Sequence, residues 1–139
     1  MARKNELIAF RKRFDTASDM VSWISSQIND WFQAPQPVMA LALKLFHKVN
    51  LEPINVMAHK LILDCIYLTF NGLGYRLTIR ELVKKSNDIM GIKVRPEPHK
   101  WARPYMDVIC DTLNCLPSDL PMRENGTMAS SPSSGASSE

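Results

Sequence analysis

The sequence lacks any long hydrophobic segment. Its longest uninterrupted apolar run is VMALAL, residues 38–43, whereas roughly 20 apolar residues are needed to cross a bilayer as a helix. The basic N-terminal stretch continues as a mixed amphipathic segment and contains no apolar signal region. We therefore expect no membrane partner and a cytoplasmic location.

Cysteine is scarce and is not arranged in a metal-binding pattern. The three cysteines, Cys65, Cys110 and Cys115, have apolar neighbours, and no two of them have the C-x-x-C spacing of a zinc knuckle. The three histidines likewise have no partner at a familiar ligand spacing. These absences predict reduced thiols in a reducing compartment, with neither a metal site nor a cofactor.

The sequence also contains no recognisable catalytic motif. Gly72 and Gly74 lack the lysine and the following helix that a phosphate-binding loop requires. Cys110 has no basic partner that would activate its thiol. Asp107 and Asp111 are four residues apart, a spacing that acid–base chemistry can use, but such a pair is more often a solvated helix face. We expect no catalytic residue and no enzyme activity.

What the sequence does contain is helical periodicity. Apolar residues recur at alternating intervals of three and four from Leu7 to Trp31, and this spacing predicts one helix, or two if Thr16 and Asp19 cap a second helix. This N-terminal unit, residues 1–33, either packs on its own domain or forms a dimer. The dimer interface would consist of Leu7, Phe10, Phe14, Val21, Ile24, Ile28 and Trp31.

A helical domain is predicted to follow over residues 34–121. The prolines of APQP interrupt the first pattern, and an apolar helix is expected from Val38 to Val49. The next helix should begin near Pro53 and end at Asn71, with Gly72 in the left-handed conformation. The serine-rich segment 122–139 is expected to be a disordered tail.

The clearest helix signals lie in LTIRELVKKSN, residues 77–87. Thr78 and Glu81 have the spacing of a capping box, and Gly91 is a natural end for the helix. Tyr75–Leu77 just before it is extended in character. A last helix should follow a proline-containing loop, beginning either at Pro104 or after a kinked turn. The fold class is therefore mainly α, a helical bundle with at most one short β element.

Positive charge is concentrated in two blocks of the chain. The whole chain has a formal net charge of only +3. Residues 1–13 contain five cations and one carboxylate, and residues 76–103 contain eight cations and three carboxylates. A clustered block of one sign produces a local field that favours a partner of opposite charge.

The capped LTIRELVKKSN segment, followed by a second helix with a basic beginning, resembles the core of a winged helix-turn-helix domain over residues 53–116. The resemblance implies that ELVKKS belongs to the supporting helix and that the following helix enters the major groove of DNA. A wing, the β-hairpin that follows the last helix in this family, has no evident counterpart after Leu116.

Two functions are expected from these features. The first is a small DNA-binding regulator of transcription or replication, of bacterial, phage or plasmid type, whose partner is duplex DNA. The alternative is a non-enzymatic adaptor or inhibitor that binds another protein through apolar helix faces. The predicted DNA contacts are Arg76, Arg80, Lys84, Lys85, Lys93, Arg95, His99, Lys100 and Arg103.

Overall fold

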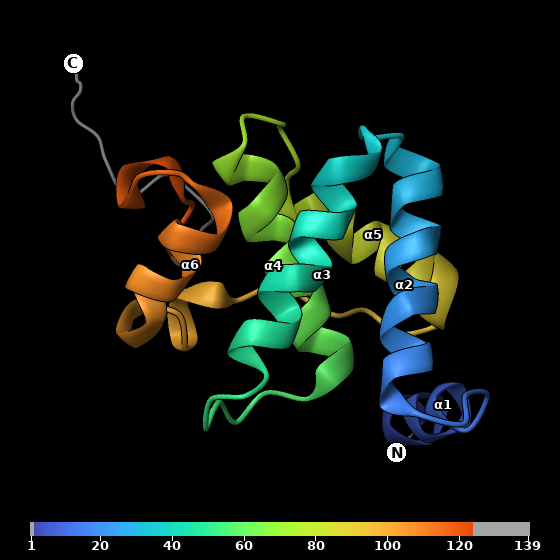
Figure 1. Ribbon diagram of the computed structural model, residues 1–139. Coiled ribbons are helices and arrows are strands. Elements are labelled where there is room, and N and C mark those ends of the chain that lie inside the picture. The colour runs from blue at the N-terminus through green and yellow to red at the C-terminus, as the bar shows by residue number, and fades with distance from the viewer. Residues whose placement is uncertain (1, 124–139) are drawn as a thin grey trace.

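The computed structural model describes residues 2–123, and side chains from Asn5 onward (Figure 1). All regular structure in this range is helical, which confirms the mainly α prediction. The α-helices are α1 Ala2–Arg11, α2 Ala17–Phe32, α3 Gln36–Val49, α4 Ala58–Gly72, α5 Ile79–Met90 and α6 Met106–Leu113. Short 3₁₀ turns are η1 Pro98–Lys100, η2 Arg103–Tyr105 and η3 Pro117–Asp119. None of these helices is both long and apolar enough to cross a membrane.

The helix α4 lies at the centre of the molecule. Every residue from Leu61 to Phe70 is buried, because α2, α3, α5 and η1 all pack against it (Figure 1). The sequence LILDCIYLTF is apolar on nearly every side, as a helix surrounded by other helices requires. α2 and α3 contribute to this same core, so the turn at residues 33–35 lies within one packed unit.

Two helix starts follow the sequence closely. Thr16 Oγ1 accepts a hydrogen bond from the Asp19 amide at 3.0 Å, so α1 and α2 form the predicted pair of helices. At α5 the capping box is complete: the Glu81 amide donates to Thr78 Oγ1 at 3.1 Å, and the Thr78 amide donates to Glu81 Oε1 at 2.9 Å. Gly91, with φ of 77°, ends α5 as expected.

The expected start of α4 at Pro53 is wrong. The helix begins at Ala58, and residues 53–57 are irregular. Half-buried Ile54 and Val56 alternate with exposed Asn55 and Met57, the period of an extended chain that rests one side on the core. The alternating apolar pattern therefore prevails over the preference of proline for a first helical turn.

The expected end of α4 is also corrected. Gly72 lies inside the helix, and it is Gly74 that has a positive φ, 94°. A Cβ atom at Gly72 would lie 3.0 Å from Leu120 Cδ2, so close packing of the C-terminal segment explains this glycine. The C-terminal segment remains packed at Met122, which is buried, although a disordered tail was expected from residue 122; residues 124–139 lie outside the described part.

The extended segment Tyr75–Leu77 pairs with a side chain and not with a strand. Asn71 Nδ2 donates to the carbonyl oxygens of Tyr67, at 2.8 Å, and of Leu77, at 2.9 Å. The Leu77 amide donates back to Asn71 Oδ1 at 3.3 Å. The asparagine amide thus replaces the neighbouring strand that an extended segment otherwise needs.

Most apolar residues of the N-terminal unit pack against the core of the same chain. Phe10, Val21, Ile24 and Ile28 are buried in the core, and Leu7 and Phe14 pack against it half-buried. Trp31 alone among the predicted dimer residues is exposed, at 38%. The N-terminal unit therefore packs on its own domain, one of the two alternatives expected from the sequence. The dimer stays a prediction, but the four buried residues cannot form its interface while the chain is folded in this way.

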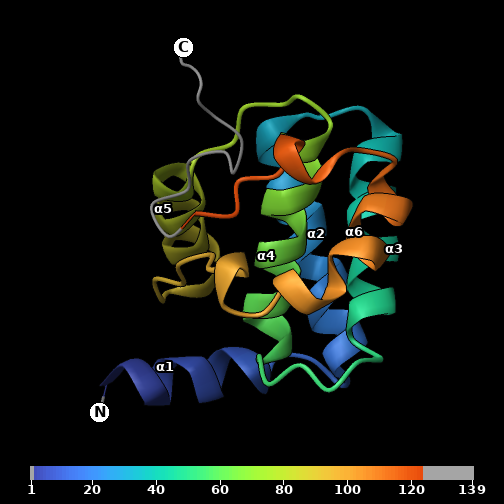
Figure 2. The ribbon, with the colours of Figure 1, turned by 90° about the vertical axis from the view of Figure 1, so that its left-hand side faces the viewer.

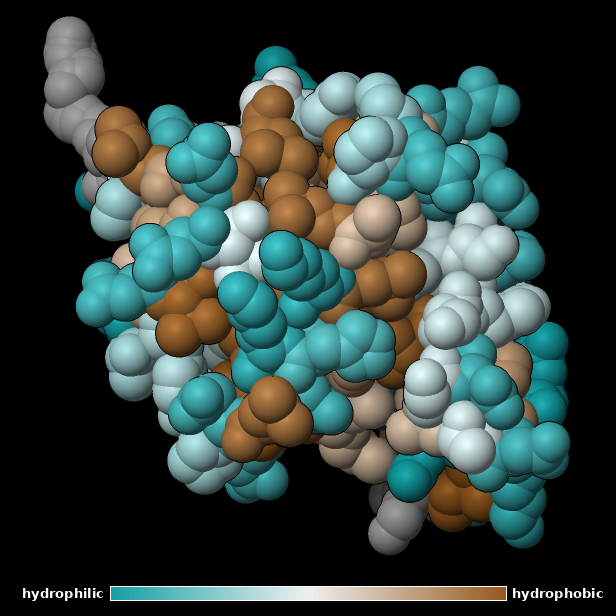
Figure 3. Space-filling view, viewed as in Figure 1, coloured by the Kyte–Doolittle hydropathy of each residue, from teal (hydrophilic) through white to brown (hydrophobic). Residues whose placement is uncertain are grey.

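Other apolar side chains remain on the surface. Figure 3 shows hydrophobic residues over α3 and around it, interspersed with hydrophilic ones. Leu51, at 85%, and Leu116, at 65%, are the most exposed large hydrophobic residues in the described part of the chain. Leu116 lies beyond the last α-helix, which ends at Leu113, where Asn114 adopts the left-handed conformation, φ 54°.

Candidate nucleic-acid interface

The outer face of α5 is basic. Arg80 and Lys84 are exposed and lie four residues apart, so they are neighbours on one face of the helix, and exposed Asn87 continues that face. We call these three residues the α5 basic face. The opposite face, which includes Leu82, Ser86 and Met90, is buried against α2 and α4.

The cations of the α5 basic face are not neutralised by carboxylates. Within residues 5–123, neither Arg80 nor Lys84 has a carboxylate oxygen within 4.0 Å. The nearest acidic residue in sequence, Glu81, is occupied by the capping box with Thr78. The guanidinium and ammonium groups therefore face solvent and are available to an anionic partner.

Lys85 lies on a different side of α5 from Lys84, because one residue turns a helix by about 100°. It is half-buried, and its ammonium lies 5.7 Å from the centre of the Trp31 ring of α2. Such cation–π contacts stabilise a helix pair by roughly 0.5–1 kcal/mol at exposed sites. Lys85 is thus held against α2 and does not belong to the α5 basic face.

The loop after α5 is fixed to the core in an extended form. Exposed Lys93 and Arg95 alternate with buried Ile92, Val94 and Pro96. The buried Ser86 hydroxyl accepts a hydrogen bond from the Val94 amide at 3.0 Å. The two loop cations are consequently presented on the surface by a well-anchored backbone.

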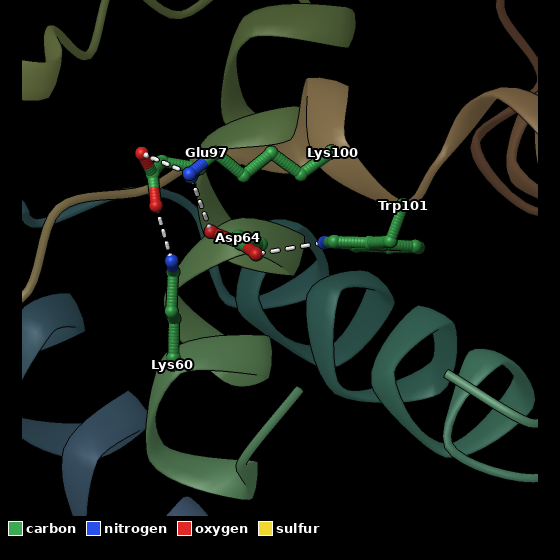
Figure 4. Close-up of polar contacts among 5 residues, drawn as sticks. All are labelled: Lys60, Asp64, Glu97, Lys100 and Trp101. Carbon is green, nitrogen blue, oxygen red and sulfur yellow. Dashed lines mark hydrogen bonds and ion pairs between the residues drawn. The ribbon is translucent and has the colours of Figure 1, made fainter. Parts of the chain in front are cut away.

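A buried carboxylate holds the next part of this basic segment (Figure 4). Asp64 of α4 is fully buried, and its Oδ1 accepts a hydrogen bond from the Glu97 amide at 2.9 Å. Its Oδ2 accepts a hydrogen bond from Trp101 Nε1 at 2.7 Å. Burial raises the pKa of Asp64 to about 6, although these two hydrogen bonds and the charge of Lys60 favour the ionised form.

Glu97 joins the same network from the surface side. Its Oε1 contacts the ammonium of Lys60, and its Oε2 lies 3.1 Å from Lys100 Nζ (Figure 4). The hydrogen bond from Lys60 is the main reason that the pKa of Glu97 is lowered. Lys100 therefore shares a carboxylate with Lys60, and less of its charge is available to a ligand than that of Lys84.

Sequence reasoning did not identify Asp64. The signal was present in LILDCIYL, residues 61–68, where one carboxylate interrupts an otherwise apolar helix. A carboxylate buried in such a helix must find hydrogen-bond donors, and Trp101 and the loop amide of Glu97 supply them. Which donors it finds depends on the tertiary fold.

The predicted DNA contacts do not all lie on one pair of adjacent helices. α5 packs on α2 and α4, whereas α6 packs on α3 and η2. In both Figure 1 and Figure 2, α4 lies between α5 and α6. Arg76, Arg80, Lys84, Lys93 and Arg95 belong to α5 and its flanking segments. His99 and Lys100 lie in η1, which packs on α4, and Arg103 lies in η2, which packs on α6.

This arrangement differs from the one that the resemblance to a winged helix-turn-helix implies, in which the two helices pack together. Ser86 and Asp64 fix the connecting segment across α4, which keeps α5 and α6 apart. The first turn of α6 contains exposed Asp107, and Arg103 precedes it in η2. No β-hairpin follows α6 in the residues described up to Arg123.

The chemistry available at this surface is the binding of anions. Among residues 5–123, no group of three or more His, Cys, Asp or Glu side chains is placed to hold a metal ion. Burial raises the pKa of all three cysteine thiols, most strongly that of Cys65, which is fully buried. Comparisons with protein-family models, with curated proteins and with solved structures gave no significant match. Function must therefore be inferred from the site.

Proposed function

We propose that this chain binds duplex DNA, as a small regulator of transcription or replication would, through phosphate contacts made by the α5 basic face. One observation carries this proposal: Arg80 and Lys84 lie side by side on a helix that is fixed at both ends, and neither has a carboxylate partner in residues 5–123. Fixed cations of this kind bind phosphate without first breaking an ion pair.

The flanking cations extend the same surface along the chain. Arg76 is exposed just before the Thr78 cap, and Lys93 and Arg95 are exposed in the loop that Ser86 anchors. Five exposed cations thus lie within twenty residues of α5 and its flanking segments, and most protein contacts to duplex DNA are made to phosphate and sugar.

Weak sequence preference is expected of such a surface. A recognition helix contacts base edges with the residues of its first turn. The first turn of α6 contains Asp107, whose carboxylate would be repelled by phosphates, and no cation. We therefore assign phosphate contacts to α5 and its flanks and no base contacts to α6.

The adaptor alternative depends on the apolar residues of α1 and α2, most of which pack inside the molecule, although Trp31 stays exposed. Phe10, Val21, Ile24 and Ile28 would have to leave the core before they could bind another protein. The α5 basic face needs no such rearrangement, which makes DNA the better supported partner.

The test is a titration of labelled duplex DNA of random sequence, followed by fluorescence anisotropy at several salt concentrations. The double variant Arg80→Gln/Lys84→Gln should bind more weakly, and the slope of log affinity against log salt should fall by about two, one for each lost phosphate contact. Binding should weaken to the same degree for different sequences.

A matched control is available on α3. Lys44 and Lys48 are also exposed and four residues apart, so Lys44→Gln/Lys48→Gln removes the same charge from a different helix. This control should keep most of its affinity. Equal weakening by both double variants would reduce the binding to net charge alone, and no binding by the unmodified chain at low salt would refute the proposed function.

A further inference from the structure

Residues of α1 and of the beginning of α4 line two adjoining hollows. These two parts of the chain lie at the lower end of the molecule in Figure 2. Their volumes are about 600 Å³ and about 470 Å³, and Met57 and His59 line both of them. We call the two together the α1–α4 groove. Cavities of roughly 300–1,000 Å³ with mainly apolar walls and a few polar groups are typical of small-molecule sites.

His59 is the unusual residue of this groove. Only 7% of the residue is exposed, and it lines both hollows. Its ring nitrogens are not among the fully buried polar atoms without a partner in residues 5–123, so they reach the space of the hollows. A neutral imidazole that opens into a hollow can donate one hydrogen bond to a group that binds there.

No side chain caps the amides at the start of α4, which lie beside the groove. The N-cap residue, Met57, has no side-chain oxygen that could accept a hydrogen bond from them, and the first turn contains no acidic residue. The amides at the start of a 15-residue helix, with the positive end of its dipole, favour an anion.

The charged residues around the groove also favour an anion. Arg11 and Lys12 line one hollow, with Asp15 as the only carboxylate among its described lining residues. Lys60 and Lys100 line the other, and they share Glu97. Four cations thus surround two carboxylates, which leaves the α1–α4 groove positive.

We propose that the α1–α4 groove binds a small organic anion with an apolar body. Its carboxylate or phosphate group would accept hydrogen bonds from His59 and from the first amides of α4. Its hydrocarbon part would lie on Met57 and the apolar walls contributed by α1, such as Ile8. This site uses none of the residues of the α5 basic face, so it stands or falls independently of DNA binding.

Octanoate and 1-octanol are suitable probes, because they share a hydrocarbon chain and differ in charge. Titration of the full chain, followed by amide NMR, should give saturable shifts at Ala58 and His59 with octanoate. The alcohol should bind roughly tenfold more weakly, since it loses the contributions of the helix start and of the cations. Equal affinity for the two probes, or no saturable shift at Ala58 and His59, would overturn the proposal.

The protonation of His59 gives a second readout. Burial, Arg11 and Lys60 lower its pKa in the free protein, so the ring is neutral near pH 7. An anion bound beside it should raise that pKa, which NMR of the ring protons measures directly. A titration of His59 that octanoate leaves unchanged would place the carboxylate elsewhere and exclude the assigned binding mode.

A pair of single variants separates local from overall charge. Arg11→Gln removes an exposed cation of the groove and should weaken octanoate binding by roughly threefold, a typical effect of one partly exposed charge. Lys44→Gln removes the same charge from α3, outside the groove, and should leave the affinity unchanged. Equal weakening by both variants would show that only net charge matters and would reject the site.

Discussion

The two sides of α4 differ in the interactions that determine their structure. On one side α5 is a regular helix with a complete capping box at Thr78, a glycine end at Gly91 and an apolar face that packs on the core. On the other side the chain reaches α6 through two 3₁₀ turns, and neither turn has a side-chain cap. Local signals define α5, whereas the carboxylate of Asp64 defines the path to α6.

This difference also decides where charge is available. Lys84 and Lys100 are both exposed lysines in the same basic stretch of sequence. Lys84 projects from a regular helix and has no carboxylate oxygen within 4.0 Å among residues 5–123, while Lys100 lies in the turn that Asp64 holds and is 3.1 Å from Glu97. A cluster of cations in sequence therefore becomes a usable surface only where the fold leaves it unpaired.

The largest expected effect concerns the pH dependence of stability on the α6 side. The pKa of Asp64 is raised from 3.8 to about 6 in the folded chain, so the folded state favours the protonated carboxyl. This contribution is fully present below pH 4 and is lost as the pH rises through 6. A shift of about two units corresponds to roughly 3 kcal/mol of unfolding free energy.

Urea denaturation at pH 4 and at pH 7, for the unmodified chain and for Asp64→Asn, measures this contribution. The asparagine variant cannot titrate, so it should lack that part of the pH dependence while other groups, such as Glu97, titrate in both proteins. If the two proteins lose stability in parallel between these pH values, the Asp64 carboxyl is not the group responsible.

An intermediate effect compares two tryptophans, one on each side of α4. Trp101→Phe removes the indole donor to Asp64 and should lower the unfolding free energy by about 2 kcal/mol, a typical loss for a hydrogen bond to a charged group. Trp31→Phe, at an exposed position against Lys85, should cost roughly 0.5 kcal/mol. Denaturation curves that rank the two variants in the opposite order would contradict the proposed role of Asp64.

An effect smaller than that of Trp101→Phe is expected at the α5 cap. Thr78→Ala removes the side-chain acceptor for the Glu81 amide and should destabilise the protein by about 1 kcal/mol. Thr78→Ser keeps the hydroxyl and should restore most of that loss in thermal or urea unfolding. A serine variant as unstable as the alanine variant would mean that the methyl group, and not the cap, matters at this position.

The sequence predicts those parts of the fold that depend on neighbouring residues. The start and end of α5, the cap at Thr16 and the mainly α class all follow from signals a few residues apart. The path from Gly91 to Met106 does not, because Asp64 and Trp101 are separated by 37 positions along the chain. The start of α4 was missed because proline is compatible with both a helix start and an extended segment.

The candidate site shows the same limit. Exposed cations could be read directly from the sequence, and Arg80 and Lys84 lie on one face as their spacing predicts. The separation of α5 from α6 could not be predicted, since it follows from which residues anchor the intervening loop. His59 gave no signal either, because its place on the wall of both hollows is visible only in the folded chain.

The side-chain amide of Asn71 affects the orientation of α5 relative to α4. Through three hydrogen bonds it joins the last turns of α4 to the residue before the Thr78 cap, so the direction of α5 is set by one side chain at the bend. An aspartate there would match its size but turn an oxygen toward two carbonyl groups. The orientation of the Arg80–Lys84 surface on the molecule thus depends on a nitrogen atom that is not part of that surface.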